Sequence, residues 1–506
     1  MSKTPRPHHL HASFLRGSIN VDELGFDIDD INLDDPDLPI DSDAGNNNLQ
    51  GNDRIGFSFH RRSSVSDFNL NGLRNEHIYE SPDHLAASAA KGVKGRFLDD
   101  LPFELLQDYG KKDVLARFAP KEIVLGRKLG SGEYSHVYSI RCFSLNSKNE
   151  ETLSQDEKNE RKHMKKNERS DAGRGRYALK HLRPELLTKY DPLDYAQAAS
   201  DLALEAELLS SLQHPHIIKL RGISIDGTSG FAQGAKGYFL IIDKLTETLD
   251  ARIKRWKKSK KFVISSVKKK AGKSDGKEED VFSEDQVKVA LQIAAAMKFL
   301  HSKKVIFRDL KPQNVGFDIR GDVKIFDFGL ACLMPSNGDP NQDKYEMSGA
   351  GSPRYMAPEV LVDEPLYNLK ADVYTFGIVL WEILSLQLPY SDITSRPALI
   401  NSVVNKGERP PIPKAWPLPI RETMSIGFDA ETEKRPTMEL FYNILRFQLL
   451  ELRGWDSSQL GNSFINRRRS TRTLCENEEG KTQSHLRSSI KRKMVNGMKK
   501  RLSWDM

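Results

Sequence analysis

The stretch "FRDLKPQNVGFDIRGDVKIFDFG", residues 307–329, decides the fold. Two short apolar strands in it flank the turn "RGD", and we expect Ile319 to pair with Val323 across that turn. This register brings Asn314 and Asp327 to the same end of one hairpin. Amide and carboxylate oxygens on a rigid support are ligands that proteins offer to Mg²⁺. The hairpin therefore predicts a magnesium site formed by Asn314 and Asp327.

The loop before the hairpin carries two further polar residues that can face the same place. Asp309 lies five residues before Asn314, where a carboxylate can orient an attacking hydroxyl and accept its proton. Lys311 adds positive charge that suits a transferring phosphoryl group. Each residue alone would pass for a solvated turn residue, but together they favour a phosphotransfer site.

A glycine-rich turn precedes this region in "KLGSGEYSHVYSI", which supplies Gly130 and Gly132. Ser135 occupies the place of the third glycine in a G-x-G-x-x-G pattern. The turn lacks the Gly-Lys-Ser/Thr ending of a Walker loop, and strand residues follow it where a Rossmann fingerprint needs a helix. A glycine turn between strands lets backbone N–H groups lie close over phosphates. Taken alone, a plain flexible hairpin remains the alternative.

Lys180 and Glu205 form the second candidate cluster. Lys180 lies in the alternating strand pattern "RYALKHL", and Glu205 lies on the same face as Leu202 and Leu209 in an Ala/Leu-rich helix pattern. A buried carboxylate is costly unless it is paired, so we expect Lys180 to be its partner. That pair would hold the ammonium near α- and β-phosphates. The alternative is a partly exposed Glu205 at the edge of the helix face.

Composition separates the ends of the chain from its middle. The first fifty residues hold ten Asp/Glu against three Lys/Arg, whereas the tail from Trp455 holds twelve Lys/Arg against five Asp/Glu. That surplus of seven equals the net charge of the whole chain, +7, so the basic character belongs to the tail. Neither end has enough apolar residues to offset the entropy of ordering.

The organisation expected from these patterns has one folded domain with two insertions. Two charged stretches interrupt the apolar patterning, and we expect both to be solvated loops, the first without any apolar face. The expected parts are a disordered acidic region over 1–95, a docking helix within 96–120, a folded domain over 121–453 with charged insertions at about 144–175 and 256–282, and a basic disordered tail over 454–506.

The bulk features favour a reducing compartment and no membrane span. Cys142, Cys332 and Cys475 are too far apart for a disulfide framework or a metal knuckle. No apolar run reaches the length of a membrane-spanning helix, and the N-terminus lacks the apolar core of a secretory signal. We expect a cytoplasmic location, or else a nuclear one.

From about Ile123 to Leu452 the chain resembles the eukaryotic protein kinase domain, and these motifs occur in that family's order. "GSGEYSHV" resembles the glycine-rich loop, "FRDLKPQN" the catalytic loop, "DFG" the metal-binding turn and "APE" the end of the activation segment. "DLKPQN" and "GSPRYMAPE" are similar to the serine/threonine type, and "ADVYTFGIVLWEIL" to the tyrosine-kinase-like group that includes MAP kinase kinase kinases. The resemblance implies an α+β fold, with a small β-rich N-lobe carrying one key helix and a larger helical C-lobe.

The resemblance also implies a set of site residues and cofactors. It implies transfer of the γ-phosphate of ATP to a protein hydroxyl with Mg²⁺ held by Asn314 and Asp327, and Asp309 as the base. The implied ATP contacts are Gly130, Ser131, Gly132, Tyr134, Val137, Ala178, Lys180 and Asp243. Among these, Val137 and Ala178 would cover the adenine ring, and Asp243 begins the hinge, directly after Ile242 at the gatekeeper position. Glu359 is expected to pair with Arg435, and Asp372 to begin the central helix.

Phe307 and Gly316 depart from the family pattern. Phe307 occupies the position of a histidine that serves mainly as a packing element beside Phe328, so we expect activity to survive. Gly316 occupies the position of a large apolar residue beneath adenine. Either the floor of that pocket is thinner, or a neighbour such as Ile325 or Phe326 fills the space.

The resemblance also implies regulation and protein partners, and the charge of the basic tail indicates further ones. Arg308 is implied to bind a phosphorylated activation segment, with Ser348 as the phosphosite and Ser352 in contact with Asp309 or Lys311. Expected partners are protein substrates, an upstream kinase, and acidic partners or anionic surfaces for the basic tail. Two other functions stay open: a scaffold with a kinase fold and no phosphotransfer, and a kinase for a small molecule.

Overall fold

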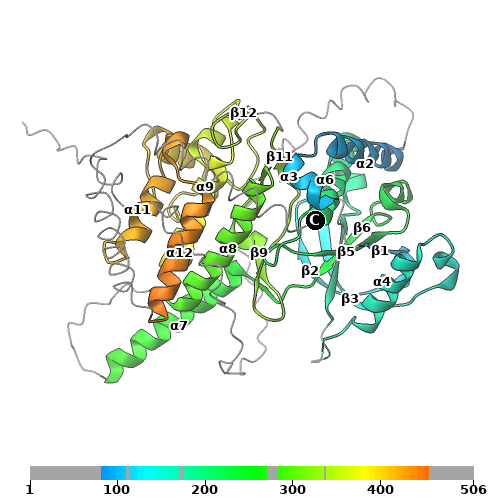
Figure 1. Ribbon diagram of the computed structural model, residues 1–506, viewed down its shortest axis with the longest axis horizontal. Helices are drawn as coiled ribbons and strands as arrows, with labels where there is room; N and C mark the ends of the chain where they lie inside the picture. The colour runs from blue at the N-terminus through cyan, green and yellow to red at the C-terminus, as the bar shows by residue number, and fades with distance from the viewer. Residues whose placement is uncertain are drawn as a thin grey trace, which may run out of the picture. The chain divides into compact units, whose positions relative to one another are not determined.

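The computed structural model describes residues 81–109, 114–170, 173, 175–270, 282–335 and 338–454, with the backbone alone over 107–109 and 261–270. The predictions for residues 1–80 and for the basic tail from 455 onward fall outside the described residues. The described chain forms a β-rich N-lobe and a helical C-lobe (Figure 1), which confirms the predicted α+β two-lobed fold.

The N-lobe is built on a six-stranded sheet in the order β1-β5-β6-β4-β3-β2. β1 pairs parallel with β5, and the other neighbours pair antiparallel. Its strands are β1 Ala116–Phe118, β2 Ile123–Ser131, β3 Ser135–Phe143, β4 Tyr177–Leu182, β5 Leu220–Ser224 and β6 Phe239–Asp243. Its helices are α2 Pro82–Asp99, α3 Phe103–Tyr109, α4 Gln155–Lys166, α5 Leu186–Lys189 and α6 Pro192–Ser211.

The C-lobe packs around one buried helix. Its helices are α7 Leu249–Lys270, α8 Glu284–Ser302, α9 Lys370–Ser385, α10 Arg396–Ile400, α11 Leu418–Gly427 and α12 Met438–Leu452. All residues of α9 from Lys370 to Leu384 are buried, as an all-round apolar pattern predicts for a central helix. α8 begins with a capping box, in which Ser283 and Gln286 satisfy each other's backbone N–H groups.

Three smaller sheets lie outside the N-lobe sheet. A three-stranded sheet has the order β10-β9-β7, and two further pairs are β8 with β11 and β12 with β13. These strands are β7 Glu247–Thr248, β8 Val305–Ile306, β9 Val315–Phe317, β10 Val323–Ile325, β11 Cys332–Leu333, β12 Tyr345–Glu346 and β13 Leu366–Tyr367.

The register predicted for the β9–β10 hairpin is wrong by two residues. Val323 pairs with Phe317 rather than with Ile319, so Val315 lies opposite Ile325 and not opposite Asp327. The turn is longer than "RGD" because the Asp318 side chain accepts hydrogen bonds from the N–H groups of Arg320 and Asp322. A shift of two keeps the same faces of each strand, so the side chains still point as expected.

The start of the folded part and both charged insertions also differ from the prediction. Helix α2 begins at Pro82, within the region predicted to be disordered up to residue 95, because its Ala-rich face is buried against α6. The first insertion was predicted to have no apolar face, but it contains helix α4, which packs on β1 and buries Met164 and Arg161. In the second insertion, the backbone of α7 continues as helix to Lys270.

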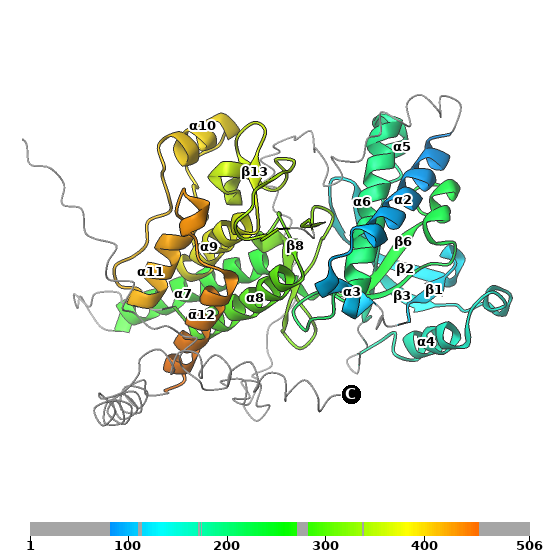
Figure 2. The ribbon, with the colours of Figure 1, turned by 45° about the horizontal axis from the view of Figure 1, so that its top comes forward.

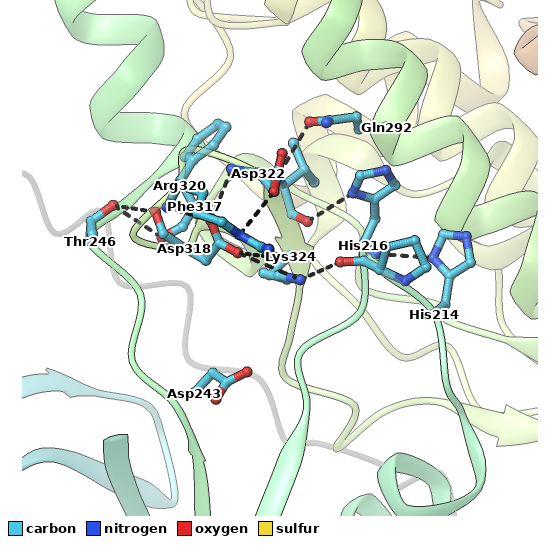
Figure 3. A network of polar contacts seen from close by, with 12 residues as sticks. His214, His216, Asp243, Thr246, Gln292, Phe317, Asp318, Arg320, Asp322 and Lys324 are labelled. Carbon is cyan, nitrogen blue, oxygen red and sulfur yellow. Dashed lines mark hydrogen bonds and ion pairs between the residues drawn. The ribbon is translucent and has the colours of Figure 1, made fainter. Parts of the chain in front are cut away.

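The loop after α6 ties the N-lobe to the β9–β10 hairpin (Figure 3). Ile218 N–H donates to the Ile325 carbonyl at 2.9 Å, and Ile325 N–H donates to the His216 carbonyl at 2.8 Å. Lys324 donates to the Pro215 carbonyl and faces the Asp318 carboxylate, and Val323 N–H donates to Gln292 of α8. These contacts fix the hairpin that carries Asn314 and Asp327 relative to helix α6.

Candidate active site

Lys180 joins two carboxylates from opposite lobes. Its Nζ donates to Glu205 Oε1 at 2.9 Å and Oε2 at 2.6 Å, and to Asp327 Oδ1 at 2.8 Å. Lys180 comes from the buried strand β4 and Glu205 from the inner face of α6, and both are almost fully buried. The pairing expected between Lys180 and Glu205 is therefore present, and Asp327 joins it.

Burial and charge oppose each other in this cluster. Burial alone would lower the pKa of Lys180, but the Asp327 and Glu205 carboxylates raise that pKa above its ordinary value. Burial raises the pKa of Glu205, an effect that Lys180 counteracts and Asp327 reinforces. A cation fixed between two carboxylates is stable as an ammonium and is suited to hold phosphate oxygens.

Asp309 is the centre of a second polar group. Its Oδ2 accepts from Asn314 Nδ2 and from Lys311 Nζ, each at 2.8 Å, and its Oδ1 accepts from the Ser352 hydroxyl at 2.8 Å. Lys311 Nζ also donates to the Ser352 hydroxyl at 2.7 Å. Ser352 therefore contacts both Asp309 and Lys311, and four of the predicted site residues come together here.

The hairpin connects these two groups and fits a divalent metal ion. Phe326 N–H donates to the Asn314 carbonyl at 3.0 Å, which places Asp327 directly beside Asn314. The amide nitrogen of Asn314 donates to Asp309, so the amide oxygen of Asn314 points away from Asp309. An amide oxygen and a carboxylate are hard oxygen ligands, as Mg²⁺ prefers. Asp327 has a positive φ of 66°, a strained conformation that turns its side chain toward Lys180.

The glycine-rich turn between β2 and β3 is held by a residue that the sequence did not indicate. Within the turn, Gly132 N–H donates to the Ser135 carbonyl at 2.9 Å. Arg183 Nη1 donates to the carbonyls of Gly132 and Glu133 at 3.3 and 3.0 Å, and its N–H donates to the Tyr134 carbonyl at 2.9 Å. Arg183 directly follows β4, so the turn is anchored to the strand that carries Lys180.

The predicted adenine contacts lie on three adjacent strands. Val137 pairs with Lys180, and Ala178 pairs with Ile242. The Asp243 carboxylate forms a two-pronged ion pair with Arg221 at 2.7 and 2.9 Å, so only the backbone of Asp243 is left to meet a nucleotide. In Figure 3 the Asp243 side chain lies apart from the polar network of the β9–β10 hairpin.

The space beside Gly316 is filled by two side chains. A Cβ atom at Gly316 would lie 2.5 Å from Leu245 Cδ1, 3.2 Å from the Glu247 carbonyl oxygen and 3.3 Å from Phe326 Cε1. Phe326 is one of the two neighbours that the sequence suggested, and Leu245 was not foreseen. Side chains from other positions thus occupy the space that a large residue at position 316 would fill, which agrees with the second alternative and not with a thinner floor.

Phe307 fills a closed apolar position. It is fully buried, and its ring centroid lies 5.0 Å from that of Phe328. The Asp372 carboxylate accepts from the N–H groups of Phe307 and Arg308 at 2.8 and 2.9 Å, and lies 3.1 Å from His301 Nε2. The aromatic ring and the backbone contacts therefore hold the loop without a polar group at position 307.

Arg308 reaches the segment after the hairpin. Its Nε donates to the Leu330 carbonyl at 2.6 Å, and its Nη1 lies 3.4 Å from the Ser348 hydroxyl and 3.3 Å from the Tyr367 hydroxyl. Among the described residues, its buried Nη2 has no hydrogen-bond partner. Arg308 and Ser348 are thus adjacent, as the sequence suggested.

The expected pair between Glu359 and Arg435 closes the segment. Arg435 Nη1 and Nη2 each donate to one Glu359 oxygen at 2.7 Å, and the Arg435 side chain is fully buried. Such a two-pronged pair is geometrically specific, so it fixes the end of the segment against the C-lobe.

With this geometry, comparison with known proteins identifies the family. The family described as "Protein tyrosine and serine/threonine kinase" matches residues 123–445, and the chain belongs to that family. The match agrees with the resemblance to the protein kinase domain and with the serine/threonine features of the sequence.

Individual relatives are similar over shorter stretches. A stretch of 164 residues is 38% identical to the dual specificity protein kinase shkB of Dictyostelium discoideum, covering 32% of this chain and 24% of that protein. One of 149 residues is 39% identical to the serine/threonine-protein kinase STY46 of Arabidopsis thaliana, covering 29% and 24%. Another of 164 residues is 39% identical to a mitogen-activated protein kinase kinase kinase 7-like protein of Drosophila melanogaster, covering 31% and 39%. The matched stretches span less than half of each relative.

The helices of the structure also bear on the membrane prediction. Over the described ranges, no helix combines the length and the apolar character that crossing a membrane requires.

Proposed function

We propose that this protein is a serine/threonine protein kinase that transfers the γ-phosphate of ATP to a hydroxyl group of a protein substrate. The observation that carries the proposal is the contact of Asp309 with Asn314, Lys311 and Ser352 beside the Lys180–Asp327 pair. Family membership over 123–445 and serine/threonine kinases among the relatives support the same reaction.

Each polar residue has one role in the proposed reaction. Asp309 orients the substrate hydroxyl and accepts its proton, and Lys311 neutralises charge on the phosphoryl group during its transfer. Lys180, held by Glu205, binds the phosphates of ATP, which the glycine-rich turn covers. Asn314 and Asp327 would hold Mg²⁺, which when bound supplies charge neutralisation between the phosphate groups.

The ATP contacts proposed around the adenine ring are Val137, Ala178 and the backbone at Asp243. The proposed contacts with the phosphates are the glycine-rich turn residues Gly130, Ser131, Gly132 and Tyr134. This assignment is supported by the pairing of the three strands and by the anchoring of the turn through Arg183.

Ser348 is the proposed activating phosphosite. Its hydroxyl lies 3.4 Å from Arg308 Nη1, and the adjacent Nη2 has no partner among the described residues. A phosphate on Ser348 would offer three acceptor oxygens to this buried guanidinium. Because Ser348 is only 7% exposed, the segment has to open before an upstream kinase can reach it. Ser348→Ala should lower activity while the unfolding temperature stays unchanged, and full activity in this variant would refute the regulatory role.

We further propose that this protein phosphorylates its protein substrates in the cytoplasm or the nucleus. The location rests on sequence features alone, among them the spacing of the cysteines. Binding of the basic tail to acidic partners or anionic surfaces rests likewise on its charge.

A phosphotransfer assay tests the function. The full chain would be incubated with labelled ATP, Mg²⁺ and a generic protein substrate, beside the variant Asp309→Asn. We expect transfer to serine or threonine that falls at least about a hundredfold in the variant, because the proton acceptor is lost. A folded wild-type protein, carrying phosphate on Ser348, that binds ATP without transferring phosphate would instead support the scaffold function.

A further inference from the structure

Helix α2 lies outside the 123–445 region that matches the kinase family, yet it runs along the helix that carries Glu205. The Tyr195 hydroxyl donates to Asp83 at 3.3 Å near the start of both helices. Lys94 forms an ion pair with Glu207 at 3.3 Å near their ends. The two helices are therefore parallel, as Figure 2 shows for α2 and α6.

Small residues let the two helices approach closely. Ala86, Ala89 and Ala90 of α2 are at most 1% exposed, and Ala89 packs with Leu85 against Ala196 of α6. α6 also packs on strands β4 and β5 of the sheet, so it is covered on two sides. As a result α6 buries thirteen of its twenty residues, many more than a surface helix with one apolar face would.

The next helix extends these contacts to the C-lobe. Leu105 of α3 is fully buried, and α3 packs against α6. The Glu104 carbonyl accepts from Lys303 Nζ at 2.9 Å, and the Glu104 carboxylate lies 3.6 Å from Lys304 Nζ. Both lysines directly precede β8, which leads into the 307–314 loop. Residues 82–109 thus touch both the helix of Glu205 and the segment before Asp309.

We propose that residues 82–109 form a brace that holds α6 in the position where Glu205 pairs with Lys180. Glu205 lies between the two tie points at Tyr195 and Glu207, so a movement of α6 away from the sheet has to break the α2 contacts. The same movement would break the 2.6 Å contact between Lys180 and Glu205. The brace is a positioning element, and its effect on catalysis rests on the proposed kinase function.

A matched pair of substitutions in the full chain tests the brace. Ala89→Arg places a long charged side chain in the buried face of α2, and Ser88→Arg places the same side chain at an exposed position of that helix. The measurements are amide hydrogen exchange over residues 192–211, affinity for Mg·ATP by calorimetry, and phosphotransfer to a generic protein substrate. We expect Ala89→Arg to speed exchange in α6 and to weaken both ATP binding and transfer by about tenfold relative to Ser88→Arg.

Two results would overturn the proposal. One is equal exchange in α6 for the two variants, and the other is faster exchange with unchanged ATP affinity and transfer. If the wild type transfers no phosphate, the kinase proposal fails, while exchange and ATP affinity still decide whether the brace exists.

A charge exchange covers the case in which Ala89→Arg fails to fold. Lys94→Glu places like charges beside Glu207, and the double variant Lys94→Glu/Glu207→Lys restores the pair in reverse. We expect a loss of about two- to fivefold in ATP affinity for the single variant, which the double variant recovers. Equal values for the single variant, the double variant and the wild type would contradict the brace.

Discussion

The ring of Phe307 packs edge-on against the ring of Phe328, with centroids 5.0 Å apart and planes at 73°. Both rings are fully buried. Phe307 belongs to the loop that carries Asp309, and Phe328 belongs to the turn that carries Asp327. This contact sets the distance between the loop of Asp309 and the turn of Asp327. The volume and shape of the side chain at position 307 are therefore what the site needs.

Phe307→Ala should impair both stability and activity. The cavity should cost about 3–5 kcal/mol of unfolding free energy, and the loosened loop should lower kcat. Phe307→His keeps an aromatic ring of similar position and should retain phosphotransfer. Denaturant unfolding and steady-state kinetics check both variants. A His variant that is more than about tenfold faster than wild type would mean that Phe307 impairs the chemistry.

The polar cluster was predictable from sequence because its residues lie in short motifs with strict spacing. The pair of Lys180 and Glu205 followed from the cost of a buried carboxylate, and that pair is present. The register of the hairpin was missed because the Asp318 side chain binds backbone N–H groups and lengthens the turn. Such turn chemistry is ambiguous when several registers keep the same strand faces.

Helix α2 and the first insertion were missed for a different reason. Both have low average hydrophobicity, so neither predicts burial by itself. Ala89 and Ala90 become core residues only because α6 is available to cover them. Arg161 is fully buried in a stretch rich in charge because Glu122, from a distant segment, accepts its hydrogen bond. Tertiary partners of this kind leave no periodic pattern in the local sequence.

Arg161→Ala should strongly destabilise the N-lobe. Arg161 Nη2 donates to Glu122 Oε1 at 2.6 Å, its Nη1 donates to the Arg117 carbonyl at 3.0 Å, and its guanidinium lies over the Phe118 ring. Removing it leaves the Glu122 carboxylate buried and without its cation, which should cost about 3–5 kcal/mol. Thermal and denaturant unfolding measure the loss.

The neighbouring exposed residue provides the control for Arg161. Lys162→Ala changes the same kind of charge in the same helix and should alter stability by less than about 0.5 kcal/mol. Equal stability of the two variants would mean that α4 does not hold β1 in place.

Glu382 should make stability depend on pH near neutrality. Burial raises its pKa to about 7, although the Tyr355 hydroxyl, which donates to it at 2.9 Å, acts in the opposite direction. Asp250 raises the pKa further, and Arg354 lowers it. Between its ordinary value of 4.5 and about 7, the folded state binds a proton that the unfolded state has lost. The stabilisation from this proton is complete below 4.5 and is lost as the pH rises through about 7.

Glu382→Gln removes this titration and should flatten the pH profile of stability between 4.5 and 8. At pH 8 the variant should be more stable than wild type, by up to roughly 3 kcal/mol if the amide keeps the Tyr355 hydrogen bond. Unfolding free energies measured across the range check the sign. An identical profile for wild type and Glu382→Gln would show that Glu382 is ionised in the folded protein throughout.

Gly316→Ala should be costly, and Leu245→Ala should relieve part of that cost. The new Cβ would lie 2.5 Å from Leu245 Cδ1, at the end of a flexible side chain, and 3.2 Å from the Glu247 carbonyl oxygen, which belongs to the backbone. We expect Gly316→Ala to lose about 1–3 kcal/mol of stability and to weaken Mg·ATP binding.

In the double variant the methyl group of residue 316 occupies space that Leu245 vacated, so a coupling energy of about 1–2 kcal/mol should appear. Leu245→Ala alone is the control that opens the space without filling it. Strictly additive effects on unfolding free energy and on ATP affinity would mean that Leu245 does not replace the missing side chain at position 316.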